Sequence, residues 1–461
     1  MLNRDEAREI IGDLWGLHVS ERYRFERIAR YLEGSAGLPD LPKTASDDIR
    51  DIRRISGKTI VGVVVDSFAE NLSVSGFRNR EGEHDAEAWK RWKAQRLATR
   101  QDEVHRSALT YGTGYAVVLP EGGNAYVRYR SPRRLVAAYR DPAVDVFPQF
   151  ALEVWVTSEG GKSVLRGLLL DDTHGWPITF GKAPKWLGAI DAHKVLAGST
   201  AIGEPVAHGA GVCPVVRFTD TSDDGQVRGE VEPLMTPQRA INSVNFDRLV
   251  VSRFGAFPQK VITGWAGTRE EQLAASAKDL WAFEDPDVRA QVLMGSEGRG
   301  YNELIEDLME HVAMVAKLSP ASITGRMVNL SADALAAGEK SQQRKLARLR
   351  TSLGESHADV MRLMARIETG EDVDDFESET VWDDTEARSF AGVVDGITKL
   401  ANVGVPVQHM LSLIPGLPTW QQQAIKRAMQ GGQDFASLMN SITGAPNASA
   451  DAAPADEPAQ G

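Results

Sequence analysis

The chain of 461 residues contains a single cysteine, Cys213, so it cannot form an intrachain disulfide. That scarcity favours a reducing compartment, and a chain of this length can bury a large core without covalent cross-links. No stretch approaches the ~18 consecutive apolar residues of a transmembrane helix, because the best candidate, residues 59–68, is short and contains Asp66. The N-terminus carries charges where a secretory signal needs an apolar core. We therefore expect no membrane insertion and no export by that route.

Basic residues are in the minority. The chain has 52 Lys and Arg against 64 Asp and Glu, which gives a formal charge of −12. Nucleic-acid binding over a broad face depends on neutralising phosphates, so this balance disfavours tight nonspecific DNA binding by one chain. Hydrophobic residues make up 42% of the chain and charged residues 25%, as in globular proteins. The length corresponds to about three domains.

Metal and cysteine chemistry have little support. None of the nine histidines lies in an HExxH pattern or beside a second histidine at ligand spacing. Cys213 cannot form a CxxC site, and its apolar neighbours suggest a buried, inert thiol. We predict no catalytic residues, no metal site and no cofactor.

Two glycine-containing fragments resemble nucleotide-binding loops only in part. Residues 159–163 (EGGKS) match the end of a phosphate loop, but its first glycine is missing and no helix is predicted to follow. We interpret this fragment as a hairpin turn. Residues 112–114 (GTG) lack the third glycine of a dinucleotide site. The adjacent acids at 171–172 and 383–384 would point apart on a strand.

In the first half of the chain, the sequence pattern predicts helices near the N-terminus and strands after them. Apolar residues from Ile10 to Leu17 recur at helical spacing in a helix covering the first thirty-odd residues, and residues 87–109 are predicted as one further helix. Short runs rich in Val, Leu and Tyr, bounded by Gly, Pro, Asp or Asn, then predict a mainly antiparallel sheet. These strands are expected at 115–119, 125–129, 135–139, 151–157 and 163–170.

The second half is predicted to be mostly helical. A helix begins near Pro233 and ends before Gly255, and a small mixed unit follows. A second helix is expected at 302–318 with Asn302 as its N-cap, then a short loop at 319–330. A long helix follows from a cap at Ser331. Extended segments of the mixed unit are expected at 280–283 and 290–294.

Charge clusters mark two further segments. Residues 368–386 hold ten acidic residues and are predicted as a solvated loop with one strand. A basic run on the long helix is interpreted as a subunit interface or a solvated face. This run comprises Arg344, Lys345, Arg348 and Arg350.

The order of these elements resembles the portal proteins of tailed bacteriophages, over roughly residues 10–430. The matching segments include VEPLMTPQRAINSVNFDRLVVSRFGAFPQKVITGW, SPASITG and SADALAAGEKSQQRKLARLRTSLG, in that order. Nearer the two ends, VVVDSFAENLSVSGFR, ALTYGTGYAVV, SPRRLVAAYRDP and VWDDTEARSFAGVVDGITKLANVGVP also match. One departure is SADAL at 331–335, where many relatives carry Ser-Gly-Glu-Ala.

The resemblance implies an α+β, mainly helical fold of the portal type, with an α/β wing, a two-helix stem, a small α/β clip, a tunnel loop, a long wing helix and a helical crown. It assigns 1–232 to the wing, 233–255 to the first stem helix, 256–301 to the clip and 302–318 to the second stem helix. It assigns 319–330 to the tunnel loop, 331–368 to the long wing helix, 369–387 to a wing strand and 388–443 to the crown. The biased composition of 444–461 predicts a disordered tail.

The same resemblance implies a homo-oligomeric ring, normally of twelve subunits, at one capsid vertex of the virion, assembled in the host cytoplasm. Double-stranded DNA would pass through with weak contact, and the large terminase, a head-tail adaptor and a major capsid or scaffold protein would be the other partners. Tunnel-loop residues expected to face DNA are Lys317, Ser322, Thr324, Arg326 and Asn329. Clip residues expected in docking are Trp265, Glu270, Glu271 and Trp281.

Two other functions stay open at this stage. The acidic segment and the two glycine-containing fragments allow a metal-dependent nucleic-acid hydrolase, in which Lys162 or Asp383 would be required for turnover. A capsid or scaffold component that forms no pore is the other alternative. The absence of any catalytic constellation favours the portal hypothesis over the hydrolase.

Overall fold

The computed structural model describes most of the first 383 residues. The described ranges are 2–182, 200–255, 259–263, 289–293, 299–325, 332–370, 377–383, 396–397, 399–401, 403–406, 410–411, 425–427 and 429. The chain divides into two compact units, Met1–Val381 and Trp382–Gly461, and the first carries the elements discussed below. Within the described ranges, no helix is both long and apolar enough to cross a bilayer.

Helix α1 (Arg4–Leu32) packs on a six-stranded antiparallel sheet. It begins with a capping box, in which the Asn3 side chain accepts from the Glu6 N–H and the Glu6 carboxylate accepts from the Asn3 N–H. Its apolar stripe, including Trp15, meets Trp176 and other sheet residues in a buried core. In sheet order the strands are β4 (Leu135–Ala138), β5 (Phe150–Glu159), β6 (Lys162–Leu170), β7 (His174–Lys182) and β8 (Ala201–Ile202), and β9 (Val206–Ala207) also pairs with β7.

A second antiparallel sheet contacts α5 (Leu97–Tyr111) and the long helix α11 (Ala332–Thr369). The two helices meet at His105 and His357, whose Nε2 atoms are 2.8 Å apart. Burial lowers the pKa of His105 to about 3 and that of His357 well below its usual range, so the pair is neutral and one ring donates to the other. The strands, in order, are β10 (Val215–Thr219), β2 (Thr113–Glu121) and β3 (Asn124–Arg130).

Strand β1 (Val74–Arg78) pairs with β15 (Glu379–Trp382), which brings an early and a late segment of the sequence together. The Ser75 hydroxyl also donates to the carbonyl of Val381 at 3.3 Å. Three shorter helices lie in this part of the sequence, namely α2 (Asp47–Ile55), α3 (Ile60–Ala69) and α4 (Ala86–Ala94).

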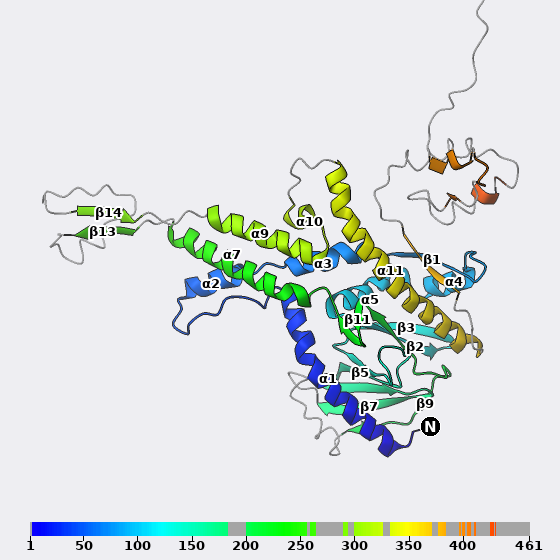
Figure 1. The fold of residues 1–461 in the computed structure, drawn as a ribbon. Coiled ribbons are helices and arrows are strands. Elements are labelled where there is room, and N and C mark those ends of the chain that lie inside the picture. Colours follow the sequence, from blue (N-terminus) through cyan, green and yellow to red (C-terminus); the bar gives the residue numbers. More distant parts are fainter. Residues whose placement is uncertain are drawn as a thin grey trace, which may run out of the picture. The chain divides into compact units, whose positions relative to one another are not determined.

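Helices α7 (Met235–Gly255) and α9 (Arg299–Ala316) lie side by side (Figure 1). The strands β13 (Gln259–Thr263) and β14 (Arg289–Leu293) form an antiparallel pair in the sequence between them. The short helix α10 (Pro320–Thr324) follows α9 and precedes α11. Before α7 come a small hairpin, β11 (Thr221–Asp223) and β12 (Gln226–Arg228), and the 3-10 turn η3 (Glu232–Leu234).

Most of the predicted elements are present. The five predicted strands correspond to β2 through β6, and the turn at Gly160 and Gly161 joins β5 to β6 with positive φ at both glycines. The helices predicted near the start, after Pro233 and along the second half correspond to α1, α7, α9 and α11. A strand near Trp382 and an extended segment at 290–294 are also confirmed, as β15 and β14.

Three predictions need correction. The single helix at 87–109 is two helices, α4 and α5, because Arg96 adopts a left-handed conformation between them. Asn302 is not an N-cap, since α9 already begins at Arg299. The short loop at 319–330 contains α10, and β13 was not foreseen. The extended segment at 280–283, the cap at Ser331, the tail at 444–461 and most of the crown segment lie outside the described residues.

Candidate functional site

Helix α7 is anchored by buried amide side chains rather than by its apolar stripe alone. The Gln238 Oε1 atom accepts from the Ile60 N–H at 3.0 Å, and the Asn242 Oδ1 atom accepts from the Lys58 N–H at 2.9 Å. One turn further on, the Asn245 side chain donates to the Ser56 carbonyl at 2.7 Å. These bonds satisfy backbone groups that would otherwise be buried without partners, and they fix α7 to the connection between α2 and α3.

The chain reverses direction between α9 and α10 at a tight C-terminal cap. Lys317 adopts φ of 66°, and the Leu318 N–H donates back to the Ala313 carbonyl at 2.9 Å. This is the left-handed C-cap arrangement that glycine usually supplies. Ser319 is extended and Pro320 occupies the first turn of α10, so the second helix begins at once.

Three of the residues predicted to face DNA lie in this reversal. Lys317 and Ser322 are exposed, while the half-buried Thr324 hydroxyl donates to the Pro320 carbonyl at 3.0 Å within α10. The structure thus brings these three together on one short segment. The other two, Arg326 and Asn329, lie outside the described residues. The same holds for the clip residues Trp265, Glu270, Glu271 and Trp281.

Lys345 on α11 holds the end of α9 in place. Its Nζ atom bonds the Glu230 carboxylate and donates to the Ala316 carbonyl at 3.0 Å. It also lies 4.5 Å from the centre of the Phe68 ring, in a cation–π contact. The Lys345 and Glu230 side chains are only 11% and 9% exposed, so this is a buried ion pair. One ammonium group therefore joins α3, α9, α11 and the segment before η3.

A polar stripe continues along α11 from Lys345. The hydroxyls of Ser352 and Ser356 donate to the carbonyls of Thr219 and Arg217, each at 2.9 Å. Strand β10 is at the edge of its sheet, and these hydroxyls cover its outward carbonyls. The sequence does contain this signal, as small polar residues at helical spacing beside the seam of Leu346, Leu349 and Leu353, but apolar periodicity alone does not reveal it.

Arg348, which is exposed, bonds a buried carboxylate from the same stripe. Its guanidinium donates to the Asp220 carboxylate and to the Asp220 carbonyl, both at 2.8 Å. Burial and the neighbouring Glu230 carboxylate raise the pKa of Asp220 to about 7, although Arg348 opposes this rise. The Arg350 guanidinium donates to the Asn71 carbonyl at 3.0 Å.

The prediction for the basic run is therefore wrong for two of its four members. Lys345 and Arg350 are partly buried and bond groups of their own chain, so they are not a solvated or intersubunit face. Arg344 and Arg348 are exposed as expected, although Arg348 also bonds Asp220.

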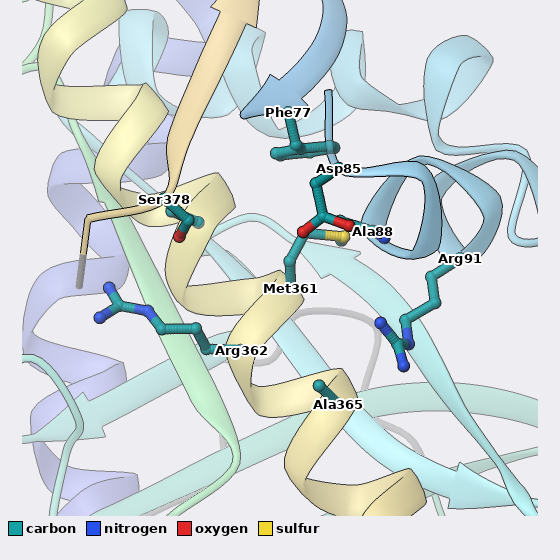
Figure 2. A pocket seen from close by; sticks show the side chains of 9 residues that line it. Phe77, Asp85, Ala88, Arg91, Met361, Arg362, Ala365 and Ser378 are labelled. Carbon is teal, nitrogen blue, oxygen red and sulfur yellow. Dashed lines mark hydrogen bonds between the residues drawn. The ribbon is translucent and has the colours of Figure 1, made fainter. Parts of the chain in front are cut away.

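A small pocket of about 70 Å³ lies between α4 and α11. Figure 2 shows Asp85 and Met361 among the residues that line it, with Arg91 and Arg362 on opposite sides. Arg91 bonds Glu368 at 2.7 Å and Arg362 bonds Asp359, so both guanidinium groups are neutralised within the chain. A pocket of this size can hold a few water molecules or one small group.

The fragments that allowed an enzyme do not form a catalytic site in the described residues. Lys162 is the first residue of β6 and pairs with Glu159 across the hairpin, so no phosphate loop is present there. Gly112 and Gly114 join a helix to a strand, the reverse of the order in a dinucleotide site. No group of three potential metal ligands occurs among the residues that the structure describes.

Comparison with known proteins identifies the family. Residues 63–433 match the family model described as "Phage portal protein, SPP1 Gp6-like". The chain belongs to this portal family. The match covers far more than half of the sequence, and the portal proteins of this family are structural rather than enzymatic.

Two curated portal proteins show the same relationship. The portal protein of Mycobacterium phage D29 is 26% identical over 367 residues, which cover 74% of this chain and 71% of that protein. The portal protein of Mycobacterium phage L5 is 26% identical over 368 residues, with the same coverage.

Solved structures of gene transfer agent particles also align. A chain from the "Virion of native gene transfer agent (GTA) particle" is 14% identical with a TM-score of 0.48, covering 85% of this chain and all of that chain. A chain from the "Neck of empty GTA particle computed with C6 symmetry" is 12% identical with the same TM-score and coverage.

Proposed function

We propose that this portal protein forms a closed ring, of twelve subunits as is usual for portals, through which double-stranded DNA passes during packaging and ejection. The observation that carries the proposal is the family match over residues 63–433. In this proposal α7 and α9 are the stem helices, β13 and β14 belong to the clip, and the segment around α10 is the tunnel loop. The large terminase and the head-tail adaptor dock on the clip, and a capsid or scaffold protein contacts the ring.

The antiparallel pair of α7 and α9 supports the assignment to a stem. Arg248 on α7 donates to the Asn302 side chain on α9 at 2.8 Å, which holds the two helices in register. The buried amides of α7 bond the start of α3, and Lys345 of α11 bonds Ala316 at the end of α9, so adjacent ends of the two helices are fixed to the rest of the subunit. A channel wall needs such anchoring, because force on DNA must not change the spacing of the helices that surround it.

The charge of the chain suits transport rather than tight binding. At −12 per subunit, a ring accumulates negative charge around its channel, and DNA phosphates gain little from such a wall. Local cations such as Lys317, next to α10, can still make weak phosphate contacts. Weak contact allows the DNA to move in either direction.

Imaging of the purified chain along its symmetry axis tests the proposal. We expect a ring with a central opening, and light scattering over a range of concentrations should detect an assembled species. A chain that remains strictly monomeric at all concentrations, also with its assembly partners present, would contradict it. An assembly without a hole would instead favour a capsid or scaffold component.

The tunnel-loop assignment has a separate test. Deleting residues 321–326 removes most of α10 but none of the side chains that anchor α7 and α9, such as Gln238 and Lys345. We expect the fold and the ring to persist while DNA packaging or retention decreases. If the deletion unfolds the subunit, the segment is part of the core and the assignment is wrong.

The hydrolase alternative can be tested with the residues that motivated it. The purified chain should show no metal-dependent nuclease or nucleotide hydrolysis, and Lys162→Ala or Asp383→Ala should change nothing. Turnover that either variant abolishes would reverse this conclusion.

A further inference from the structure

Helix α9 presents an acidic and partly apolar face to solvent. Its buried residues, including Ile305 and Val312, point toward the rest of the chain. On the other side, Asp307, Glu310 and Met314 lie within about one third of the helix circumference, at spacings of three and four residues. Met314 is 63% exposed, which is unusual for a large apolar side chain between charged neighbours. This acidic face comprises Leu304, Asp307, Glu310 and Met314.

Helix α1 presents a face of the opposite charge. Its buried side packs on the large sheet, whereas Tyr23, Arg27 and Arg30 are exposed. Tyr23 is 72% exposed. Arg27 lies near Glu232, but the Glu232 carboxylate is already bonded by Arg24 at 2.6 Å. These three residues form the basic face of α1.

The two faces match residue by residue when the helices run antiparallel. From Tyr23 the basic face proceeds by four residues to Arg27 and by three more to Arg30. From Met314, in the opposite direction, the acidic face proceeds by four residues to Glu310 and by three more to Asp307. Tyr23 would thus meet Met314, Arg27 would meet Glu310, and Arg30 would meet Asp307.

These faces do not meet within one chain. Figure 1 shows α9 running alongside α7, whereas α1 extends away from one end of α7 and packs on the sheet. Two different faces that complement each other give head-to-tail association, which closes into a ring when the rotation per subunit allows it. A pair of identical faces would give a dimer instead.

We propose that the acidic face of α9 in one subunit docks on the basic face of α1 in a second copy of the chain. The proposal rests on the proposed ring. It adds the contact by which each subunit binds the next one in a head-to-tail arrangement. Charged pairs at such a contact contribute specificity and register more than affinity. The Tyr23 ring against the Met314 thioether supplies the apolar contact.

Charge reversal of each face tests the contact in the full-length protein. The first variant carries Arg27→Glu and Arg30→Glu, and the second carries Asp307→Arg and Glu310→Arg. We expect each variant alone to lose the assembled species at concentrations where the wild type assembles, because like charges then face each other. All four substitutions in one chain should restore assembly.

Mixing the two variants gives a sharper readout. In an equimolar mixture, the unchanged acidic face of the first variant meets the unchanged basic face of the second, and the two reversed faces meet each other. We therefore expect assemblies in which the two variants alternate. A control matched to the first variant carries Arg80→Glu and Lys90→Glu, two exposed side chains elsewhere that change the charge by the same amount as that variant, and it should assemble as the wild type does.

The outcomes separate this contact from ring formation itself. If the wild type forms rings and both reversed variants do so too, the ring stands and the α1–α9 contact is wrong. If each variant fails but neither the combined chain nor the mixture recovers, the loss is not due to charge pairing, and the contact is again wrong. If the wild type forms no ring, both proposals fail. Circular dichroism of each variant confirms that the subunit is folded.

Discussion

Helices α11 and α9 both carry rows of charged residues, but they use them differently. On α11, Lys345 and Arg348 bond buried carboxylates of the same chain. On α9, Asp307 and Glu310 face solvent. The first set of charges holds the subunit together, whereas the second is available to another molecule. Charge in the sequence therefore does not reveal by itself whether a helix face is internal or external.

The largest effect should follow from breaking the Lys345 contact. Lys345→Met keeps the length of the side chain but leaves the Glu230 carboxylate buried without its cation. Removing one partner of a buried ion pair costs about 3–5 kcal/mol, so we expect the free energy of unfolding to fall by that amount. Urea unfolding at low protein concentration measures it.

Two companion variants show whether the cost comes from the unpaired charge. Lys345→Met combined with Glu230→Gln should recover much of the loss, because the carboxylate that lost its cation is also removed. Arg344→Met, on the exposed side of the same helix, should change the stability by less than ~0.5 kcal/mol. Equal effects of Lys345→Met and Arg344→Met would mean that α11 is not anchored by this ion pair.

A pair of leucines tests the same contrast without charge. Leu349 on α11 is fully buried, whereas Leu304 on α9 is 46% exposed. Leu349→Ala should cost about 2–5 kcal/mol through lost burial and the cavity left behind. Leu304→Ala should change subunit stability by less than ~0.5 kcal/mol, since little burial is lost, and should affect assembly instead. Denaturation of the subunit and light scattering of the assembly separate the two effects.

Asp220, which Arg348 contacts, makes the stability of the subunit depend on pH. Its pKa is raised to about 7 in the folded chain from an ordinary value near 4, so between these values the folded state binds the extra proton. The contribution of Asp220 to stability is thus lost as pH rises from about 4 to 7. Asp220→Asn should remove this part of the pH dependence.

The histidines act in the opposite direction and serve as an internal comparison. Burial lowers the pKa of His18 to about 4, so its contribution to stability is gained as pH rises from about 4 to 6.5. The measurement is therefore the difference between wild type and Asp220→Asn in urea unfolding from pH 4 to 8. Parallel curves for the two proteins would show that Asp220 does not titrate in this range.

Much of the fold could be predicted from the sequence because its signals are local. The strands β2 to β6 are short runs rich in Val, Leu and Tyr that are bounded by turn-forming residues, and the long helices have sustained apolar stripes. Where local signals were weak, prediction failed. The break at Arg96 has no glycine or proline to mark it, and α10 has only five residues, too few for periodicity.

Less of the site could be predicted, because its contacts join distant residues. Nothing local in the sequence indicates that Lys345 reaches Glu230, or that Ser352 and Ser356 cover the carbonyls of β10. The portal resemblance supplied the family, which the comparison confirmed, but not these contacts. The assignments of tunnel-loop and clip residues remain predictions.

The smallest expected effect on stability concerns Lys317. Here the effect of the backbone conformation on stability can be compared with the effect of the side-chain charge on DNA retention. A non-glycine residue in the left-handed region costs roughly 1–2 kcal/mol, and glycine loses part of that gain to its greater freedom in the unfolded chain. We therefore expect Lys317→Gly to raise the free energy of unfolding by about 0.5–1 kcal/mol. If Lys317 contacts DNA in the channel, the same variant should retain packaged DNA less well while its subunit is more stable. Lys317→Arg keeps the charge and the backbone strain, so it should match the wild type in both assays. Loss of retention in Lys317→Arg as well would contradict this role of Lys317, because that variant preserves both the charge and the backbone conformation.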